Sequence, residues 1–455
     1  MKRIFCFTIF VLWSSAAAQT HFSGLVFDSS AYDSLPLTAP LTRGSFVGLP
    51  PSASLLKYCP PAGNQGISAT CVGWAVAYGA RTILEGIRAE ESASHASSSG
   101  PFSPFFVYNQ IKSFQGCASG TNVERALVFL RDHGASPMKA ELEVCDATIS
   151  EEHREIARRF RIDDFKRLFV LGADNEKVVL TKKSISERKP VILVLHVPGS
   201  FLQASELWTT SETDTIGRST HAVVAIGYDD DHAGGTIHIL NSWGDQWGNR
   251  GTTTIRYDDF ARVCLAAYEM ILVRDPSDLG VTLSARMELR NADDEPMRVI
   301  SKEGRFTLDR SYPSGTRFRI LLDNRQPAYV YVLSTDTSGV ITHLFPFDTT
   351  ISAYLGYAGS GIAIPDERHF IALDDAPGVD TFCFVYSTHA LSLTSMTDRP
   401  ADSHEGIDKR LSRVLGKGLV PENDIHVDTS NGVDFTVQGT HGSIVMITVD
   451  IPHSL

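Results

Sequence analysis

Apolar residues recur at helical spacing after residue 71 and in short strand-like runs after residue 190. Spacings of three and four separate the apolar and small residues Val72, Ala75, Val76, Gly79, Ile83 and Ile87. They predict a helix that begins at Cys71 and buries one stripe, and similar patterns predict helices over 123–133 and 151–160. Gly and Asp turns separate β-rich runs at 191–197, 222–228, 236–240 and 252–256. The first half therefore reads as α+β, with helices first and an antiparallel sheet later.

The pattern changes again after about residue 273, where short β-rich runs dominate. Strands are predicted at 317–322, 329–334, 341–345, 370–373, 381–387 and 443–450, with one helix over 406–415. Such spacing is typical of a β-sandwich. The length of 455 residues also favours two or three domains. We place the domain boundary between Arg274 and Ser284, where Asp275-Pro276-Ser277-Asp278 resembles a linker.

The N-terminus has the pattern of an export signal. Lys2 and Arg3 precede an apolar run over 4–13, and Ala16-Ala17-Ala18 gives the small-residue cleavage pattern. Residues 1–18 are therefore predicted to be a cleaved signal peptide, with an uncleaved anchor as the alternative. No later stretch reaches the ~20 apolar residues of a membrane-spanning helix. We expect a secreted or periplasmic protein with a short N-terminal segment, 19–47, and domains over 48–274 and 284–455.

Charge and motif content exclude several classes of function. The formal net charge is -12, and the sequence contains no Lys/Arg-rich run. Both features argue against nucleic acid as a partner. No phosphate-binding glycine loop occurs. The acidic runs Asp229-Asp230-Asp231-His232 and Glu151-Glu152-His153 are more typical of solvated surface than of metal sites. We therefore expect neither a metal nor a cofactor.

Six cysteines remain after removal of the signal peptide, in a compartment where pairing is the default. The preferred bridge joins Cys117 and Cys145, because these residues flank a single predicted helix. Cys383, in an apolar strand, is expected to be a buried single thiol. If Cys71 is also unpaired, the remaining five are odd in number, so at least one further thiol stays outside an intramolecular bridge.

Three separated stretches carry the chemistry of a hydrolase that works through an acyl-enzyme. Gln65 precedes Cys71 by six residues, His221 opens an apolar run, and Asn241-Ser242-Trp243-Gly244 follows twenty residues later, before Trp247-Gly248. Thr70 is placed to cap the helix that Cys71 begins, and a thiol in a first helical turn is stabilised as thiolate. Cys71 alone would more often be half of a disulfide; the combination favours a nucleophile with a nearby base.

These stretches resemble the papain-like cysteine peptidases over most of residues 48–272. The resemblance implies a papain-like fold, with a helical half and an antiparallel, barrel-like β half. It implies Cys71 as nucleophile, His221 as general base and acid, and Asn241 as the group that orients the imidazole. Gln65 would donate to the oxyanion beside the Cys71 N–H, and Trp243 would shield the Asn–His hydrogen bond. The implied function is a secreted, bacterial thiol peptidase acting on peptides or proteins.

The sequence also departs from that family. Ser68 replaces the cysteine three residues before the nucleophile, Val72 replaces the aromatic residue after it, and the 19–47 segment is too short for the long inhibitory pro-segment. Two other functions therefore remain: a catalytically silent peptidase fold used for binding, and an acyl-transferring relative that uses an amine instead of water. Residues 284–455 resemble a domain of unknown function appended to bacterial peptidases, expected either to stabilise the protein or to bind substrate or envelope.

Overall fold

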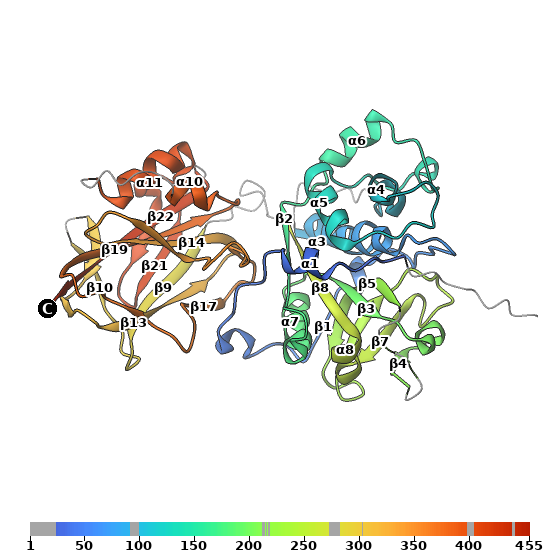
Figure 1. The fold of residues 1–455 in the computed structure, drawn as a ribbon, viewed down its shortest axis with the longest axis horizontal. Helices are drawn as coiled ribbons and strands as arrows, with labels where there is room; N and C mark the ends of the chain where they lie inside the picture. Colours follow the sequence, from blue (N-terminus) through green and yellow to red (C-terminus); the bar gives the residue numbers. More distant parts are fainter. Residues whose placement is uncertain are drawn as a thin grey trace, which may run out of the picture.

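The described residues form two large hydrophobic cores, one in each of two units that lie side by side (Figure 1), and a smaller third cluster that includes Tyr329, Leu333 and Cys383. The computed structural model describes residues 24–91, 100–211, 214, 216, 219–272, 283–302, 304–397, 405–438 and 442–455. The predicted signal peptide, 1–18, and the predicted linker, 275–278, lie outside these residues. We refer to 24–47 as the N-terminal segment, to 48–272 as the N-terminal domain and to 283–455 as the C-terminal domain. No helix in the described ranges is long and apolar enough to cross a membrane.

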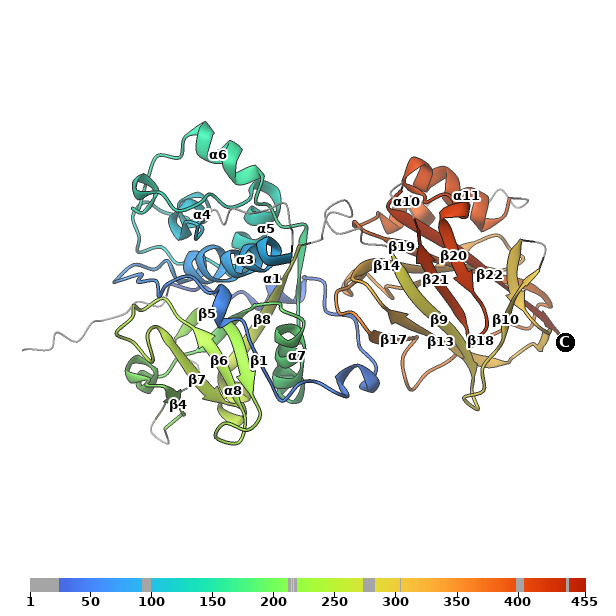
Figure 2. The same ribbon diagram turned by 180° about the vertical axis from the view of Figure 1, so that it is seen from behind.

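Most helices of the N-terminal domain gather on one side, and its strands lie on the other side together with the two helices over 174–186 and 257–263 (Figures 1 and 2). The helices are α2 (Cys71–Gly73), α3 (Thr82–Glu91), α4 (Pro104–Ile111), α5 (Val123–His133), α6 (Glu151–Arg158), α7 (Asp174–Ser186) and α8 (Tyr257–Val263), preceded by α1 (Ser29–Asp33) in the N-terminal segment. The strands are β1 (Ser52–Ser54), β2 (Asp164–Arg167), β3 (Val191–His196), β4 (Leu207–Trp208), β5 (Thr220–Asp229), β6 (Thr236–Leu240), β7 (Thr252–Arg256) and β8 (Cys264–Ile271). The predicted α+β class is confirmed.

The predicted helix after Cys71 is present, but it is buried on every side along its first three turns. A π-helical stretch, Trp74–Arg81, joins α2 to α3, and every residue over 71–81 is buried. Two glycines allow this central position. A Cβ at Gly73 would collide with the Pro104 carbonyl, and one at Gly79 would crowd Val224 on β5. The expectation of a single buried stripe is therefore wrong for residues 71–81, because α4 and the sheet enclose the helix from different directions.

The sheet of the N-terminal domain places β5 among its central strands. Its order is β2-β8-β3-β5-β6-β7-β4, with β1 paired to β5. All pairs are antiparallel except β4 with β7. The predicted strands at 236–240 and 252–256 match β6 and β7 at both ends. Because β5 and β6 are antiparallel neighbours, the start of β5 lies beside the end of β6.

The C-terminal domain is the predicted β-sandwich. One sheet has the order β10-β11-β22-β19-β14-β15, and the other β17-β13-β9-β21-β20. The strands are β9 (Ser284–Asn291), β10 (Val299–Lys302), β11 (Arg305–Leu308), β12 (Tyr312–Pro313), β13 (Arg317–Asn324), β14 (Ala328–Thr335), β15 (Ile341–Phe345), β16 (Tyr354–Leu355), β17 (Ser360–Ile364), β18 (Ile371–Ala372), β19 (Gly378–Ser387), β20 (Ile425–Asp428), β21 (Val433–Val437) and β22 (Ile444–Ser454). Alternate residues of β13 are buried, as a two-sheet core requires. Two helices, α10 (Leu393–Thr397) and α11 (Ile407–Leu415), accompany the sheets.

The N-terminal segment connects the two domains through backbone hydrogen bonds. Leu37 forms bridges both to Arg167 on β2 and to Ile351 of the C-terminal domain. The Leu37 N–H donates to the Thr350 carbonyl at 2.6 Å, and the Leu37 carbonyl accepts from Ser352 at 2.8 Å. Further along, the Ser45 hydroxyl bonds the backbone of Gly361. The segment, blue in Figure 2, therefore belongs to both domains at once.

A buried polar cluster also joins the domains. The Glu269 carboxylate accepts hydrogen bonds from Ser184, at 2.8 Å, and from Tyr357 of the C-terminal domain, at 2.7 Å. The ammonium groups of Lys166 and Lys189 each lie 3.4 Å from it. Burial acts to raise the pKa of Glu269, but these two charges and two hydroxyls hold it at about 2. The carboxylate therefore remains ionised inside the interface.

We expect Glu269→Ala to destabilise the protein by about 3–5 kcal/mol, because Lys166 is left as a buried charge without its partner. Urea unfolding followed by tryptophan fluorescence measures the change. Glu187→Ala is the matched control, since Glu187 pairs with Lys183 within one helical turn at a partly exposed site, and such pairs contribute less than about 1 kcal/mol. Equal losses in the two variants would contradict a special role for the cluster.

The same carboxylate predicts a dependence of stability on pH. Its folded-state pKa of about 2 lies below the ordinary value of 4.5, so its contribution is present above pH 4.5 and is lost as pH falls toward 2. Glu269→Gln removes this titration. Unfolding midpoints measured between pH 6 and pH 3 should therefore fall more steeply for the wild type than for Glu269→Gln.

Candidate active site

Cys71 is the first residue of the central helix and is completely buried. The preceding loop folds back on itself, because Gln65 Nε2 donates to the Ser68 carbonyl and Ser68 Oγ donates to the Gln65 carbonyl. Thr70 does not cap the helix, so this expectation is wrong. Its side chain accepts no helix N–H, and its hydroxyl instead bonds Ser68 Oγ at 2.7 Å.

His221 and Asn241 meet where β5 begins and β6 ends. His221 is the second residue of β5, and Asn241 follows the last residue of β6. His221 Nε2 lies 2.8 Å from Asn241 Oδ1. Asn241 Oδ1 also accepts the Ser242 N–H at 2.7 Å, which fixes the side-chain amide. The antiparallel pairing of β5 and β6 thus brings together two residues that are twenty positions apart.

An indole covers the imidazole. The rings of Trp243 and His221 lie 4.6 Å apart between centroids and are inclined by 30°. Trp243 and Trp247 are both buried and meet at right angles with centroids 5.6 Å apart. Trp247 is held by its indole N–H, which donates to the Phe201 carbonyl at 3.0 Å. The tryptophans therefore exclude water from the His221–Asn241 hydrogen bond.

Gln65 is fixed to the same corner by Ser242. The Ser242 hydroxyl donates to Gln65 Oε1 at 2.7 Å, and the Gln65 backbone N–H donates to the Ser242 carbonyl at 2.8 Å. With Oε1 bonded to Ser242 and Nε2 bonded to the Ser68 carbonyl, both ends of the Gln65 side-chain amide are held. Ser242 stands in the sequence motif, but no role could be assigned to it from sequence, because its partner is 177 residues away.

The thiol of Cys71 lies beside the backbone of the residue that follows His221. Burial raises the pKa of Cys71, whereas the backbone N–H groups of Ala222 and Gly24 lower it. The remaining free cysteines in the described ranges, Cys59, Cys264 and Cys383, are also shifted upward by burial, and no backbone N–H offsets the shift. Cys71 thus differs from them in its surrounding donors. The prediction that Cys383 is a buried single thiol is confirmed.

The N-terminal segment covers Cys71. A Cβ at Gly24 would collide with the Ala69 backbone, so only glycine allows this close approach. Leu25 is buried in the N-terminal core and its carbonyl accepts a hydrogen bond from Thr220, next to His221. The backbone on either side of Leu25 bonds Thr121. The Val26 N–H donates to the Thr121 carbonyl, and the Thr121 N–H donates to the Gly24 carbonyl. Short as it is, the segment reaches the thiol in the described structure.

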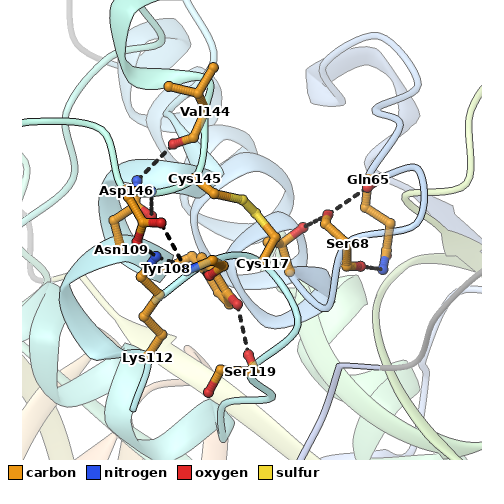
Figure 3. The surroundings of a disulfide bond; sticks show 12 residues. Gln65, Ser68, Tyr108, Asn109, Lys112, Cys117, Ser119, Val144, Cys145 and Asp146 are labelled. Carbon is orange, nitrogen blue, oxygen red and sulfur yellow. Dashed lines mark hydrogen bonds and ion pairs between the residues drawn. A yellow bond between two sulfur atoms is a disulfide. The ribbon is translucent and has the colours of Figure 1, made fainter. Parts of the chain in front are cut away.

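A disulfide fixes the loop to which the segment binds. Cys117 and Cys145 are bridged, as predicted, with Cα atoms 5.6 Å apart (Figure 3). The Cys117 carbonyl accepts the Ala69 N–H at 2.7 Å, and the Tyr108 hydroxyl holds the Ser119 carbonyl at 2.8 Å. The loop before Thr121 is therefore tied both to α4 and to the residues that precede Cys71.

Two family models match the chain. Residues 75–272 match the model described as papain family cysteine protease. The N-terminal domain belongs to this family. The match includes His221 and Asn241, and it begins four residues after Cys71. In the C-terminal domain, residues 311–390 match a domain of unknown function, DUF4384, as the sequence resemblance implied.

Solved structures of papain-family proteins are similar to the chain at low identity. Xylellain, a cysteine protease from Xylella fastidiosa, is 20% identical, with 56% of this chain and 98% of that chain covered and a TM-score of 0.43. Procathepsin L2 from the larval midgut of Tenebrio molitor is 18% identical, with coverage of 57% and 81% and a TM-score of 0.45. The ragweed pollen protease Amb a 11, in its proform, is 18% identical, with coverage of 52% and 71% and a TM-score of 0.39. No protein with a curated description matches the chain significantly.

The papain-family domain offers no metal centre within the described ranges. There, no three His, Cys, Asp or Glu side chains are grouped so that they could hold an ion. Asp230 of the acidic turn is instead paired with Lys182 and accepts from the Tyr257 hydroxyl.

Proposed function

We propose that the protein is a thiol peptidase in which Cys71 attacks the amide carbonyl and His221 transfers the proton. The observation that carries this proposal is the 2.8 Å contact between His221 Nε2 and Asn241 Oδ1. Because Asn241 engages Nε2, the other ring nitrogen, Nδ1, is the one that can exchange a proton with a thiol. A neutral amide partner orients the ring without competing for that proton.

The proposed reaction has two halves. His221 takes the proton of Cys71, and the thiolate adds to the carbonyl carbon of the peptide bond. The Cys71 N–H and the Gln65 side-chain N–H stabilise the oxyanion, His221 then protonates the leaving amine, and a thioester remains. Water, deprotonated by His221, hydrolyses the thioester and restores the free thiol.

In this proposal the described structure is a latent form of the enzyme. The Gly24 N–H lies against the Cys71 thiol and Leu25 is buried beside it in the same core, so a substrate would have to displace them, and burial keeps the pKa of the thiol raised. Displacement of the segment would admit both water and substrate. We further propose export by the predicted signal peptide to a bacterial periplasm or to the outside, and a peptide or protein as the substrate.

Labelling of Cys71 tests the proposal. Protein comprising 19–455, with the segment displaced by Leu25→Asp, is treated with a peptidyl epoxide, and the modified residue is located by mass spectrometry. We expect modification at Cys71 and cleavage within a peptide library, both lost in Cys71→Ala. Label without cleavage would indicate the silent binding fold, and product ligation that depends on added amine would indicate acyl transfer. Absence of label and of cleavage would exclude the enzyme.

Gln65→Ala should lower kcat by about 10²–10³, because one oxyanion donor is lost, with little change in KM. Initial rates on a fluorogenic peptide measure both constants. Gln246→Ala is the matched control, since Gln246 is an exposed glutamine between Trp243 and Trp247. This variant should retain full kcat. A larger effect on KM than on kcat would instead indicate that Gln65 binds the ground state.

A further inference from the structure

A cavity of about 490 Å³ lies between the two domains, away from Cys71. Its walls come from three parts of the chain: Pro36 of the N-terminal segment, Asp164 on β2, and Tyr329 and Tyr331 on β14, with further residues of the C-terminal domain. Figure 1 shows β2 at the edge of its domain that faces the C-terminal domain. The volume is within the usual range for small-molecule sites.

Tyr329 supplies a polar group that the protein itself leaves unused. Its side chain is 3% exposed, and within the described residues its hydroxyl makes no hydrogen bond. Burial and the neighbouring Asp164 carboxylate raise the pKa of Tyr329, so the phenol stays neutral. Tyr331 differs, because its hydroxyl donates to the Leu391 carbonyl at 3.1 Å and accepts the Leu391 N–H at 2.7 Å. A hydroxyl that lines a cavity and has no protein partner is available to hydrogen-bond a ligand there.

Asp164 supplies a carboxylate to the cavity. Its Oδ1 accepts the backbone N–H of Phe165 at 2.9 Å, and no ion pair to Asp164 occurs among the described residues. Burial raises the pKa of this carboxyl, although the more distant charge of Arg131 opposes the shift. Asp348 and His343 lie at the same cavity, which has two carboxylates and no Lys or Arg among its lining residues. The site is therefore acidic, with aromatic walls.

We propose that this cavity binds an alkylammonium group, as carried by a lysine side chain or by a free diamine. The ammonium would lie between the Asp164 carboxylate and the Tyr329 hydroxyl, with the tyrosine rings beside it. Carboxylates and aromatic faces both favour cations, and a desolvated site strengthens each interaction. The alkyl chain would contact Leu391 and Ile351, which also line the cavity.

Isothermal titration of the full mature chain, 19–455, carrying Cys71→Ala tests this site, because peptides then bind without being consumed. One arm uses cadaverine, with 1,5-pentanediol as its neutral counterpart. The other uses the capped tripeptide Ala-Lys-Ala, with norleucine in place of lysine as control. We expect saturable binding of at least one ammonium compound and at least tenfold weaker binding of its neutral counterpart. Binding of cadaverine alone assigns a free amine, and binding of the peptide assigns a lysine side chain.

Two variants locate the binding. Asp164→Asn should weaken it at least tenfold and Tyr329→Phe about threefold to tenfold, whereas Asp309→Asn, an exposed acid beyond β11, should leave it unchanged. Tyr329→Phe should retain the unfolding midpoint, since the hydroxyl has no partner to lose, so weaker binding in this variant is not a folding defect. Absence of binding by both ammonium compounds, equal binding of the neutral compounds, or full binding in Asp164→Asn would overturn the proposal.

Discussion

Replacement of His221 by alanine is expected to reduce kcat by about 10⁴–10⁶ in protein from which the segment has been displaced, with little change in KM. The size of this loss follows from the cooperation of nucleophile and base. When either is removed, only substrate binding and the oxyanion donors still contribute to catalysis. The structure adds a specific reason. Burial raises the pKa of Cys71, so the thiol needs a neighbouring base to become a thiolate at neutral pH. Single-turnover cleavage of a fluorogenic peptide measures the chemical step directly.

The matched control for this experiment is His238→Ala. His238 lies on β6, next to β5, and burial lowers its pKa. Asn241 bonds His221, not His238, so His238 is a histidine of the same sheet outside the proposed catalytic group. We expect it to retain kcat within a few fold. Comparable losses in the two variants would mean that the sheet is damaged in both. Full activity of His221→Ala would end the assignment of the base.

The local pattern of the sequence was sufficient for the elements that hold the site. Val123–His133 has the predicted ends, because apolar spacing on that helix coincides with a capping asparagine, Asn122, and a terminal glycine, Gly134. Likewise β6 and β7 are short β-rich runs between turns. Those short-range signals located both ends of β6 and located β5 to within two residues, whereas the pairing that brings His221 beside Asn241 was implied only by the family resemblance.

Helices without an apolar stripe were missed. On α7 the inward face is partly polar: Lys177 donates to the Ala261 carbonyl and Ser184 to Glu269. Because these partners lie 84 and 85 residues away, no local periodicity marks the face. A signal existed for α4, where Ser103 caps and Pro104 occupies the first turn, a combination typical of a helix start.

The covering of Cys71 by the N-terminal segment also lay beyond a reading of sequence. The segment has little regular structure of its own beyond α1, and long-range contacts define its course. Tyr32 is fully buried, with its hydroxyl on the Phe169 carbonyl, and Arg167 pairs with Asp33. Leu37 and Ser45 then attach the segment to the C-terminal domain. Such anchors make the C-terminal domain part of the support for the cover over the thiol.

Substitution of Leu25 by aspartate should therefore release the cover locally while its anchors remain. Burial of a leucine side chain contributes about 1.5–3 kcal/mol, and a carboxylate in its place would be buried without a partner. A change of this size raises the open fraction about 10–100-fold. We expect the rate of Cys71 modification by iodoacetamide to rise by that factor, and peptide cleavage by the full chain to rise with it.

Val26→Asp is the matched control, because Val26 is the adjacent residue and is 56% exposed. The same charge is added to the same segment, yet no apolar burial is lost, so the labelling rate should stay within threefold of wild type. Modification of Cys59 and Cys264 in the same samples reports general unfolding and should not change. If Leu25→Asp and Val26→Asp react alike, or if wild-type Cys71 already reacts as fast as an exposed thiol, the segment does not control access. Selective acceleration by Leu25→Asp means that eviction of one side chain opens the thiol, and any partner or protease that removes the segment would act through the same step.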